Sequence, residues 1–170
     1  MRRIDALELS DSRDEEVTLE DSEKAVIRWA CGQLLVNYIR AIDSKNWAAV
    51  TAGFMTEAVF SRTGSIPMKG TASIEGFFEA QDARRRAVGQ EHKTHHHITT
   101  MSIIPADSNF ARGTSYVLVF ITPNAREAGE TRHIIPDLLI EYEDEFVKTP
   151  AGWRILSHDA RHVFRSAKTS

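Results

Sequence analysis

Long β segments dominate the second half of the chain, and this feature constrains the fold more than any other. From His92 onward the residues are rich in β-branched and aromatic types, and turn-forming stretches such as "TPAGW" separate the segments. Pro136 should bend the third segment near its start or place it at an edge, because proline cannot donate to a β-ladder. The pattern predicts antiparallel strands over 92–104, 110–122, 133–149 and 153–165.

The first half of the chain is predicted to be helical. A long helix should run from Thr18, which with Asp21 approximates a capping box, to about Ile42. Its apolar residues recur every three or four positions and place Tyr38 on the buried stripe. Further helices are expected to carry Trp47, Val50 and Phe54 after a Ser44 cap, and Ile74, Phe77 and Phe78 from Thr71 to near Gly89. Helices first and strands last predict an α+β domain whose curved sheet wraps around three helices.

Length and composition favour a single domain that does not bind nucleic acid. The 170 residues suit a single domain over 18–166, preceded by a flexible, acidic arm over 1–17. A net charge of -3 does not favour a nucleic-acid partner, and the basic run Arg84-Arg85-Arg86 is expected to be a solvated helix face. Cys31 has no disulfide partner in the chain, and no apolar run approaches the ~20 residues of a membrane span. We therefore expect a cytoplasmic protein with no membrane partner.

Several short stretches together resemble one known family. They are "YIRAIDSKNW", "GTASIEGFF", "HHITT" and "YEDEFVKTPAGWRI", and their order is similar to that of the SnoaL-like branch of the NTF2-like superfamily over roughly residues 20–160. The resemblance implies a cone in which a strongly curved mixed sheet closes around a deep apolar pocket, with the helices on one side. The same fold hosts dehydratases, isomerases, cyclases, hydrolases and non-catalytic modules, so the site must decide the function.

The histidine triplet within "THHHITT" divides between two faces. Successive side chains on a strand point in opposite directions, so His95 and His97 share one face and His96 takes the other. His95 and His97 have a zinc-chelating spacing, with His92 or His133 as a third ligand, but they should point away from the pocket. We expect neither a metal nor another cofactor.

Tyr38, Asp43 and His96 are the candidate catalytic residues. The resemblance extends to bile-acid dehydratase and scytalone dehydratase sites, where a tyrosine, an aspartate near the end of the first helix and a strand histidine meet. In this interpretation His96 is the base, Asp43 orients its ring and Tyr38 donates to a substrate carbonyl. A packed phenol and a helix-end cap are the structural alternatives for Tyr38 and Asp43.

The remaining candidate residues line the expected pocket. For substrate binding they are Trp47, Phe54, Phe60, Ile98, Thr100, Tyr116 and His158. Asp144 is expected to be buried and paired with Arg112 or Arg154. Two departures from related enzymes are visible: "AVFSRTG" carries Arg62 where ketosteroid isomerases of this fold have an aspartate, and "GTSYVLVF" lacks the further acid of bile-acid dehydratases.

Two functions from different classes follow. The first is a cofactor-independent lyase (dehydratase) or isomerase that removes a proton from a small, hydrophobic, oxygenated substrate. The alternative is a non-catalytic ligand-binding or assembly module resembling the small subunit of ring-hydroxylating dioxygenases. The strand 110–122 is apolar on both faces, so a homodimer through the outer face of the sheet, or a trimer, is expected.

Overall fold

One curved sheet and three helices form the fold. The computed structural model describes residues 19–123 and 135–166. The elements are α1 (Asp21–Asp43), α2 (Trp47–Ala52), β1 (Phe54–Arg62), β2 (Met68–Lys69), α3 (Thr71–Ala87), β3 (His92–Pro105), β4 (Phe110–Pro123), β5 (Leu138–Thr149) and β6 (Gly152–Arg165). The six strands lie in the order β2-β1-β6-β5-β4-β3, and only the β1–β6 pair is parallel. The predicted α+β architecture with a curved mixed sheet is confirmed.

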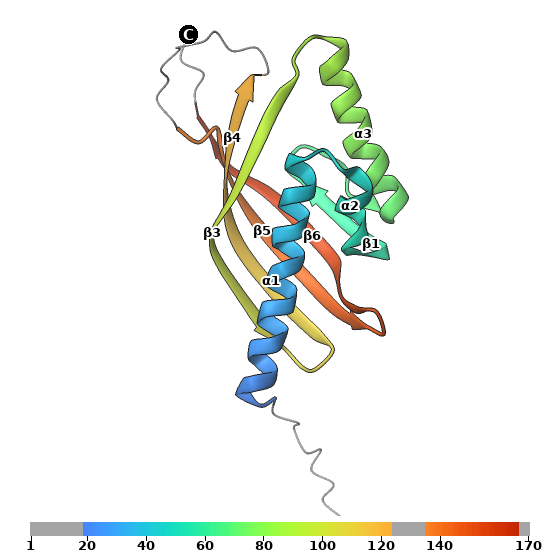
Figure 1. Cartoon of the computed structure of the whole chain (residues 1–170), viewed down its shortest axis with the longest axis vertical. Coiled ribbons are helices and arrows are strands. Elements are labelled where there is room, and N and C mark those ends of the chain that lie inside the picture. Colours follow the sequence, from blue (N-terminus) through green and yellow to red (C-terminus); the bar gives the residue numbers. More distant parts are fainter. Residues whose placement is uncertain (1–18, 124–134, 167–170) are drawn as a thin grey trace, which may run out of the picture.

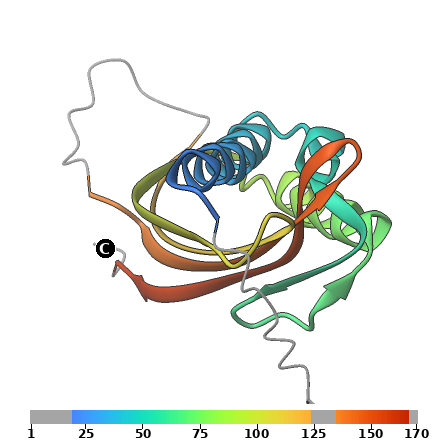
Figure 2. The ribbon, with the colours of Figure 1, turned by 90° about the horizontal axis from the view of Figure 1, so that it is seen from below.

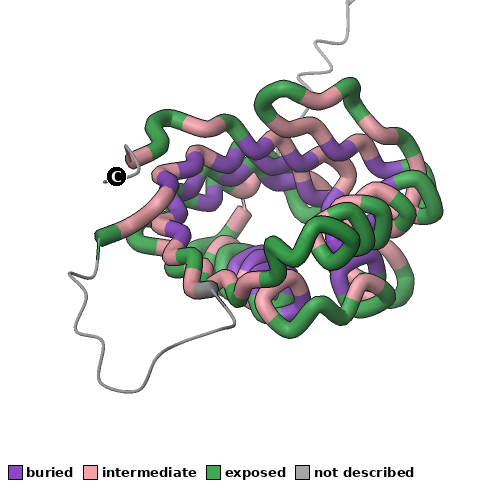
Figure 3. Tube along the Cα trace, turned by 90° about the horizontal axis from the view of Figure 1, so that it is seen from above, coloured by how far each residue is buried: buried purple, intermediate pink, exposed green. Residues whose placement is uncertain are grey.

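The sheet bends around α1, and the helices lie on its concave side (Figures 1 and 2). Buried positions gather where α1 and the strands face one another (Figure 3). On α1 they include Ile27, Cys31, Leu35 and Tyr38, as the periodicity predicts. None of the described helices is long and apolar enough to cross a membrane.

The helix boundaries differ in detail from those predicted. Glu20, not Thr18, precedes α1, and its backbone N–H donates to the Glu23 carboxylate at 3.1 Å. Ser44 ends α1 rather than capping α2, because Asn46 Oδ1 accepts from the Ala49 N–H at 3.1 Å. The arm predicted over 1–17 lies outside the described residues.

Phe54 begins β1 instead of lying on α2. The preceding residue, Gly53, already pairs with β6, since its carbonyl accepts from the Ile155 N–H at 2.9 Å. The strand predicted from residue 133 begins only at Leu138, so Pro136 lies before β5.

Register shifts change which side chains face the helices. On β3 the pairing shifts between Ile98 and Thr100, so a bulge moves the inward phase from even to odd residues and Ile103 is buried. A second shift lies on β6, opposite Glu145 and Phe146. It moves the inward phase from odd to even residues, so Ile155 and then His158 face inward. These bulges decide which side chains can reach the site.

Candidate functional site

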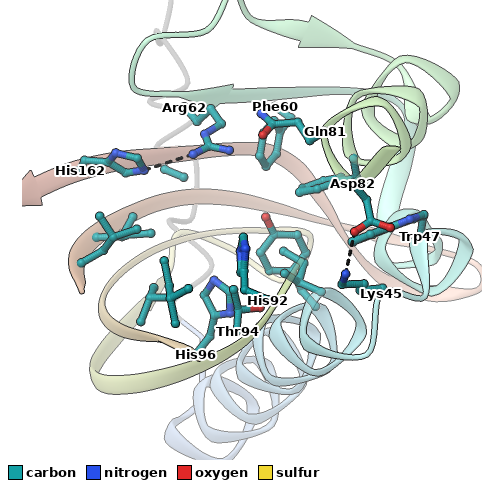
Figure 4. Close-up of a pocket in the computed structure, with 18 of the residues that line it drawn as sticks. Lys45, Trp47, Phe60, Arg62, Gln81, Asp82, His92, Thr94, His96 and His162 are labelled. Carbon is teal, nitrogen blue, oxygen red and sulfur yellow. Dashed lines mark hydrogen bonds and ion pairs between the residues drawn. The ribbon is translucent and has the colours of Figure 1, made fainter. Parts of the chain in front are cut away.

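A cavity opens between the end of α1, the inner face of the sheet and α3 (Figure 4). Its volume is about 130 Å³. The wall is apolar where Trp47, Phe60 and Val119 lie, while charged and imidazole side chains lie among these groups. The cavity can therefore hold an apolar body and still contact its polar groups.

His96 lines this cavity from β3 and pairs with Asp43 behind it. Asp43 ends α1, and its Oδ1 lies 2.6 Å from His96 Nδ1 and 3.1 Å from Thr94 Oγ1, while Oδ2 accepts from the His96 backbone N–H at 2.9 Å. The side chains of His96 and Asp43 are 10% and 24% exposed. The carboxylate thus fixes both the strand backbone and the imidazole ring.

This pairing keeps Asp43 ionised and selects one tautomer of the His96 ring. Burial raises the pKa of Asp43, but the hydrogen bonds from His96 and Thr94 outweigh it and the pKa lies below its ordinary value. An ionised carboxylate only accepts hydrogen bonds, so His96 Nδ1 must carry the proton. In the tautomer that this contact selects, the lone pair lies on Nε2, the nitrogen that does not contact Asp43.

Tyr38 lines the same cavity from α1. Its side chain is 3% exposed and packs edge-on against Phe54 and Tyr142, with ring centroids 5.8 and 6.2 Å away. Burial, with the neighbouring Tyr142 and Asp144, raises the pKa of this phenol well above its ordinary value. Tyr38 is therefore a neutral hydroxyl that can donate a hydrogen bond.

A second histidine–aspartate pair lies behind the cavity wall. His158 Nδ1 is 2.6 Å from Asp144 Oδ1, and both side chains are 0% exposed. The expectation that Arg112 or Arg154 pairs with Asp144 is wrong: Arg112 contacts Glu145, and Arg154 donates to the Trp153 carbonyl. The bulge in β6 is the cause, since it turns His158 inward beside Asp144.

Comparison with known families identifies the chain. A family model for the SnoaL-like domain matches residues 23–159. The chain belongs to this family. The fold of this SnoaL-like domain is similar to that of a solved NTF2-like protein, as the sequence predicted. Comparison with curated proteins gave no match.

Solved structures share the fold at low sequence identity. A proposed scytalone dehydratase from Novosphingobium aromaticivorans is 17% identical with a TM-score of 0.69, and the match covers 89% of this chain and 93% of that one. The hexachlorocyclohexane dehydrochlorinase LinA-type3 from Novosphingobium barchaimii is 16% identical with a TM-score of 0.67, over 86% and 93% of the chains. An NTF2-like protein with a cystatin-like fold, from Novosphingobium aromaticivorans, is 19% identical with a TM-score of 0.64, over 86% and 85%. At these identities the likeness shows the fold alone.

The SnoaL-like domain does not bring all the predicted substrate-binding residues to the cavity. Trp47 and Phe60 line it. Phe54 and His158 are buried behind the wall, in contact with the Tyr38 ring, because the β6 bulge and the early start of β1 carry them there. Ile98 packs half-buried against the core.

Thr100 and Tyr116 are exposed and face away from the cavity. The β3 bulge moves Thr100 out of phase with His96, and Tyr116 pairs with it across the outer face. Tyr116 lies beside Val117, which takes the inward position on β4. The expectation that these two residues line the pocket is therefore wrong.

The other histidines of the triplet lie outside the cavity. His95 and His97 are exposed on β3, and no group of three potential metal ligands occurs among residues 19–123 and 135–166. His133 lies outside the described residues. His92, one of the ligands considered for such a site, lines the cavity instead.

Sequence reasoning missed the charged part of the cavity wall, except that it noted Arg62 where ketosteroid isomerases have an aspartate. Lys45, Arg62, Asp82, Arg85 and His162 all line it. Arg85 belongs to the run that was expected to be wholly solvated, and only its neighbours Arg84 and Arg86 are exposed. Arg85 lies three residues after the buried Asp82 and therefore on the same face of α3 as Asp82 and Ile74, unlike its two neighbours.

Proposed function

We propose that this SnoaL-like domain is a cofactor-independent lyase or isomerase in which His96 removes a proton from a hydrophobic, oxygenated small molecule. The supporting observation is the 2.6 Å contact between His96 Nδ1 and Asp43 at the cavity wall. It leaves Nε2 as the basic nitrogen and holds the ring in one orientation, which are the two requirements for a general base.

In the proposed reaction Nε2 takes a proton from the carbon next to a carbonyl. The resulting imidazolium is stabilised by the ionised Asp43, which stays deprotonated because its pKa is lowered. Negative charge moves to the carbonyl oxygen, where the Tyr38 hydroxyl donates a hydrogen bond. In an elimination, the substrate then expels a leaving group, which takes up the proton from His96. In an isomerisation, His96 returns the proton to another carbon of the substrate.

The similar structures support this reaction class by analogy. A dehydratase and a dehydrochlorinase each remove a proton and a neighbouring group from the substrate. Both names occur among the structures with this fold. The proposed chemistry uses a base, a carboxylate that orients it and a hydrogen-bond donor; His96 and Tyr38 line the cavity, and Asp43 contacts His96 from behind.

The experiment measures proton removal directly. Exchange of the methyl protons of acetophenone in D₂O is followed by NMR with the wild type, His96→Gln and His95→Gln. We expect exchange above the buffer rate in the wild type and in His95→Gln, whose ring is exposed on the other face of β3. His96→Gln should lose about 100-fold or more, the typical contribution of a general base. Equal rates for the wild type and His96→Gln would refute the role of His96.

A further inference from the structure

Positive charge exceeds negative charge in the cavity wall. Lys45, Arg62 and Arg85 line it together with one carboxylate, Asp82. Asp82 is already paired, since its Oδ1 lies 2.7 Å from Lys45 Nζ and its Oδ2 lies 3.4 Å from Arg86 Nη2. The hydrogen bond from Lys45 lowers the pKa of Asp82, so this acid stays ionised and engaged. Within residues 19–123 and 135–166, no carboxylate forms an ion pair with either arginine of the wall.

Arg62 is the arginine of the wall whose contacts are best defined. It ends β1, is half-buried, and extends its guanidinium over the Phe77 ring at 5.8 Å. Its Nη2 lies 3.4 Å from His162 Nε2, and among the described residues no carboxylate forms an ion pair with it. Arg85 lies near enough for its charge to lower the pKa of Arg62, although burial is the larger cause.

His162 positions this guanidinium without neutralising it. Burial, followed by the charges of Arg62 and Arg165, lowers the pKa of His162, so its ring is neutral near pH 7. A neutral imidazole can accept from Arg62 through Nε2 but contributes no negative charge. A partly buried guanidinium without a counter-ion is costly, and its remaining donors suit a planar anion.

Figure 4 places Arg62 and His162 on the wall opposite His96 and Thr94. We propose that Arg62, with Arg85 beside it, binds a carboxylate of the substrate. This inference rests on the proposed function and names the substrate class: a keto acid whose carbonyl lies at His96 and whose carboxylate lies at the other end. A cavity of about 130 Å³ is close to the ~150 Å³ that holds one benzene ring, so the body between the two groups is about one ring in size.

The test compares 4-acetylbenzoate with its neutral isostere 4-acetylbenzamide. Binding of each compound is measured by calorimetry for the wild type, Arg62→Gln, Arg62→Lys, Arg84→Gln and His96→Gln. Arg84 provides the matched control, because it lies one residue before Arg85 and is exposed. Circular dichroism melting shows that each variant is folded, and the exchange of the acetyl protons is recorded on the same samples.

We expect the wild type to bind the acid about tenfold or more tightly than the amide, the size of one charge-assisted hydrogen bond. Arg62→Gln should abolish this preference and Arg62→Lys should reduce it, because lysine keeps the charge without the planar fork. Arg84→Gln and His96→Gln should retain it. If Arg62→Gln does not fold, the reduction in Arg62→Lys alone carries the test.

Two results would overturn the anion site. They are equal or undetectable binding of acid and amide by the wild type, and a preference that persists unchanged in the folded Arg62 variants. Failure of the proposed function is read separately: a preference that depends on Arg62, in a protein that exchanges no acetyl protons, supports the anion site and refutes the base role of His96.

Discussion

The buried pair of His158 and Asp144 should make a large and unequal contribution to stability. Both side chains are 0% exposed and are joined by one 2.6 Å contact. Within the described part of the chain, His158 Nε2 and Asp144 Oδ2 have no hydrogen-bond partner. Removing His158 alone therefore leaves a carboxyl group in the core without any partner.

The size of the effect follows from this enclosure. Leaving a buried carboxyl group without its hydrogen-bond partner costs about 1–3 kcal/mol, and up to about 5 kcal/mol when the pair is charged, so His158→Leu should lower the free energy of unfolding by about 1–5 kcal/mol. For a domain of this size the melting temperature should fall by roughly 2–20 °C. The double variant His158→Leu/Asp144→Val removes both polar groups, and it should lie within about 1 kcal/mol of the wild type or be more stable.

Urea unfolding followed by circular dichroism measures these differences. Arg112→Gln is the matched control, because Arg112 of β4 pairs with Glu145, the residue after Asp144 on β5, but is 71% exposed. It should change the stability by less than about 0.5 kcal/mol. A cost below about 1 kcal/mol for His158→Leu, or a double variant as unstable as the single one, would refute the reasoning.

Three further predictions concern separate parts of the molecule. Asp43→Asn should destabilise the fold at pH 7; because the folded pKa of Asp43 is lowered, this difference should shrink below about pH 4, as urea titrations at each pH would show. Burial raises the pKa of Cys31 to about 12, so mass spectrometry should detect iodoacetamide alkylation at pH 8 only in urea. Ile104 and Tyr116 are exposed apolar residues on the outer face, and we propose a homodimer there; light scattering should give a dimer mass that Ile104→Glu reduces to a monomer.

The fold was predictable because its signals are long. The stripe that includes Ile27, Cys31 and Tyr38 covers most of α1, so errors at its ends do not change which face is buried. The β segments of the second half are equally extended, and their order after the helices leaves few architectures. Short capping signals say less about where a helix begins, which is why Ser44 was predicted to cap α2 when Asn46 does so.

The phase of single side chains was less predictable. A bulge adds one residue and reverses the alternation, but in "ITTMS" its only sign is that two threonines, instead of one, separate Ile98 from Met101. The inward phase around Tyr116 is hidden too, because the residues after it are apolar on both faces of β4. Asp43 and His96 escape this problem, because they lie at a helix end and ahead of the bulge.

The two histidine–aspartate pairs show why local chemistry could not assign the site. Each joins Nδ1 to a carboxylate at 2.6 Å, so the bond itself does not distinguish His96 from His158. Their surroundings do: His96 lines the cavity, whereas aromatic rings enclose His158, with Tyr142 at 4.5 Å and Tyr38 at 4.7 Å between ring centroids. Loss of the first imidazole should therefore reduce proton exchange with little change in stability. Loss of the second should reduce stability first and affect exchange only through the packing of Tyr38.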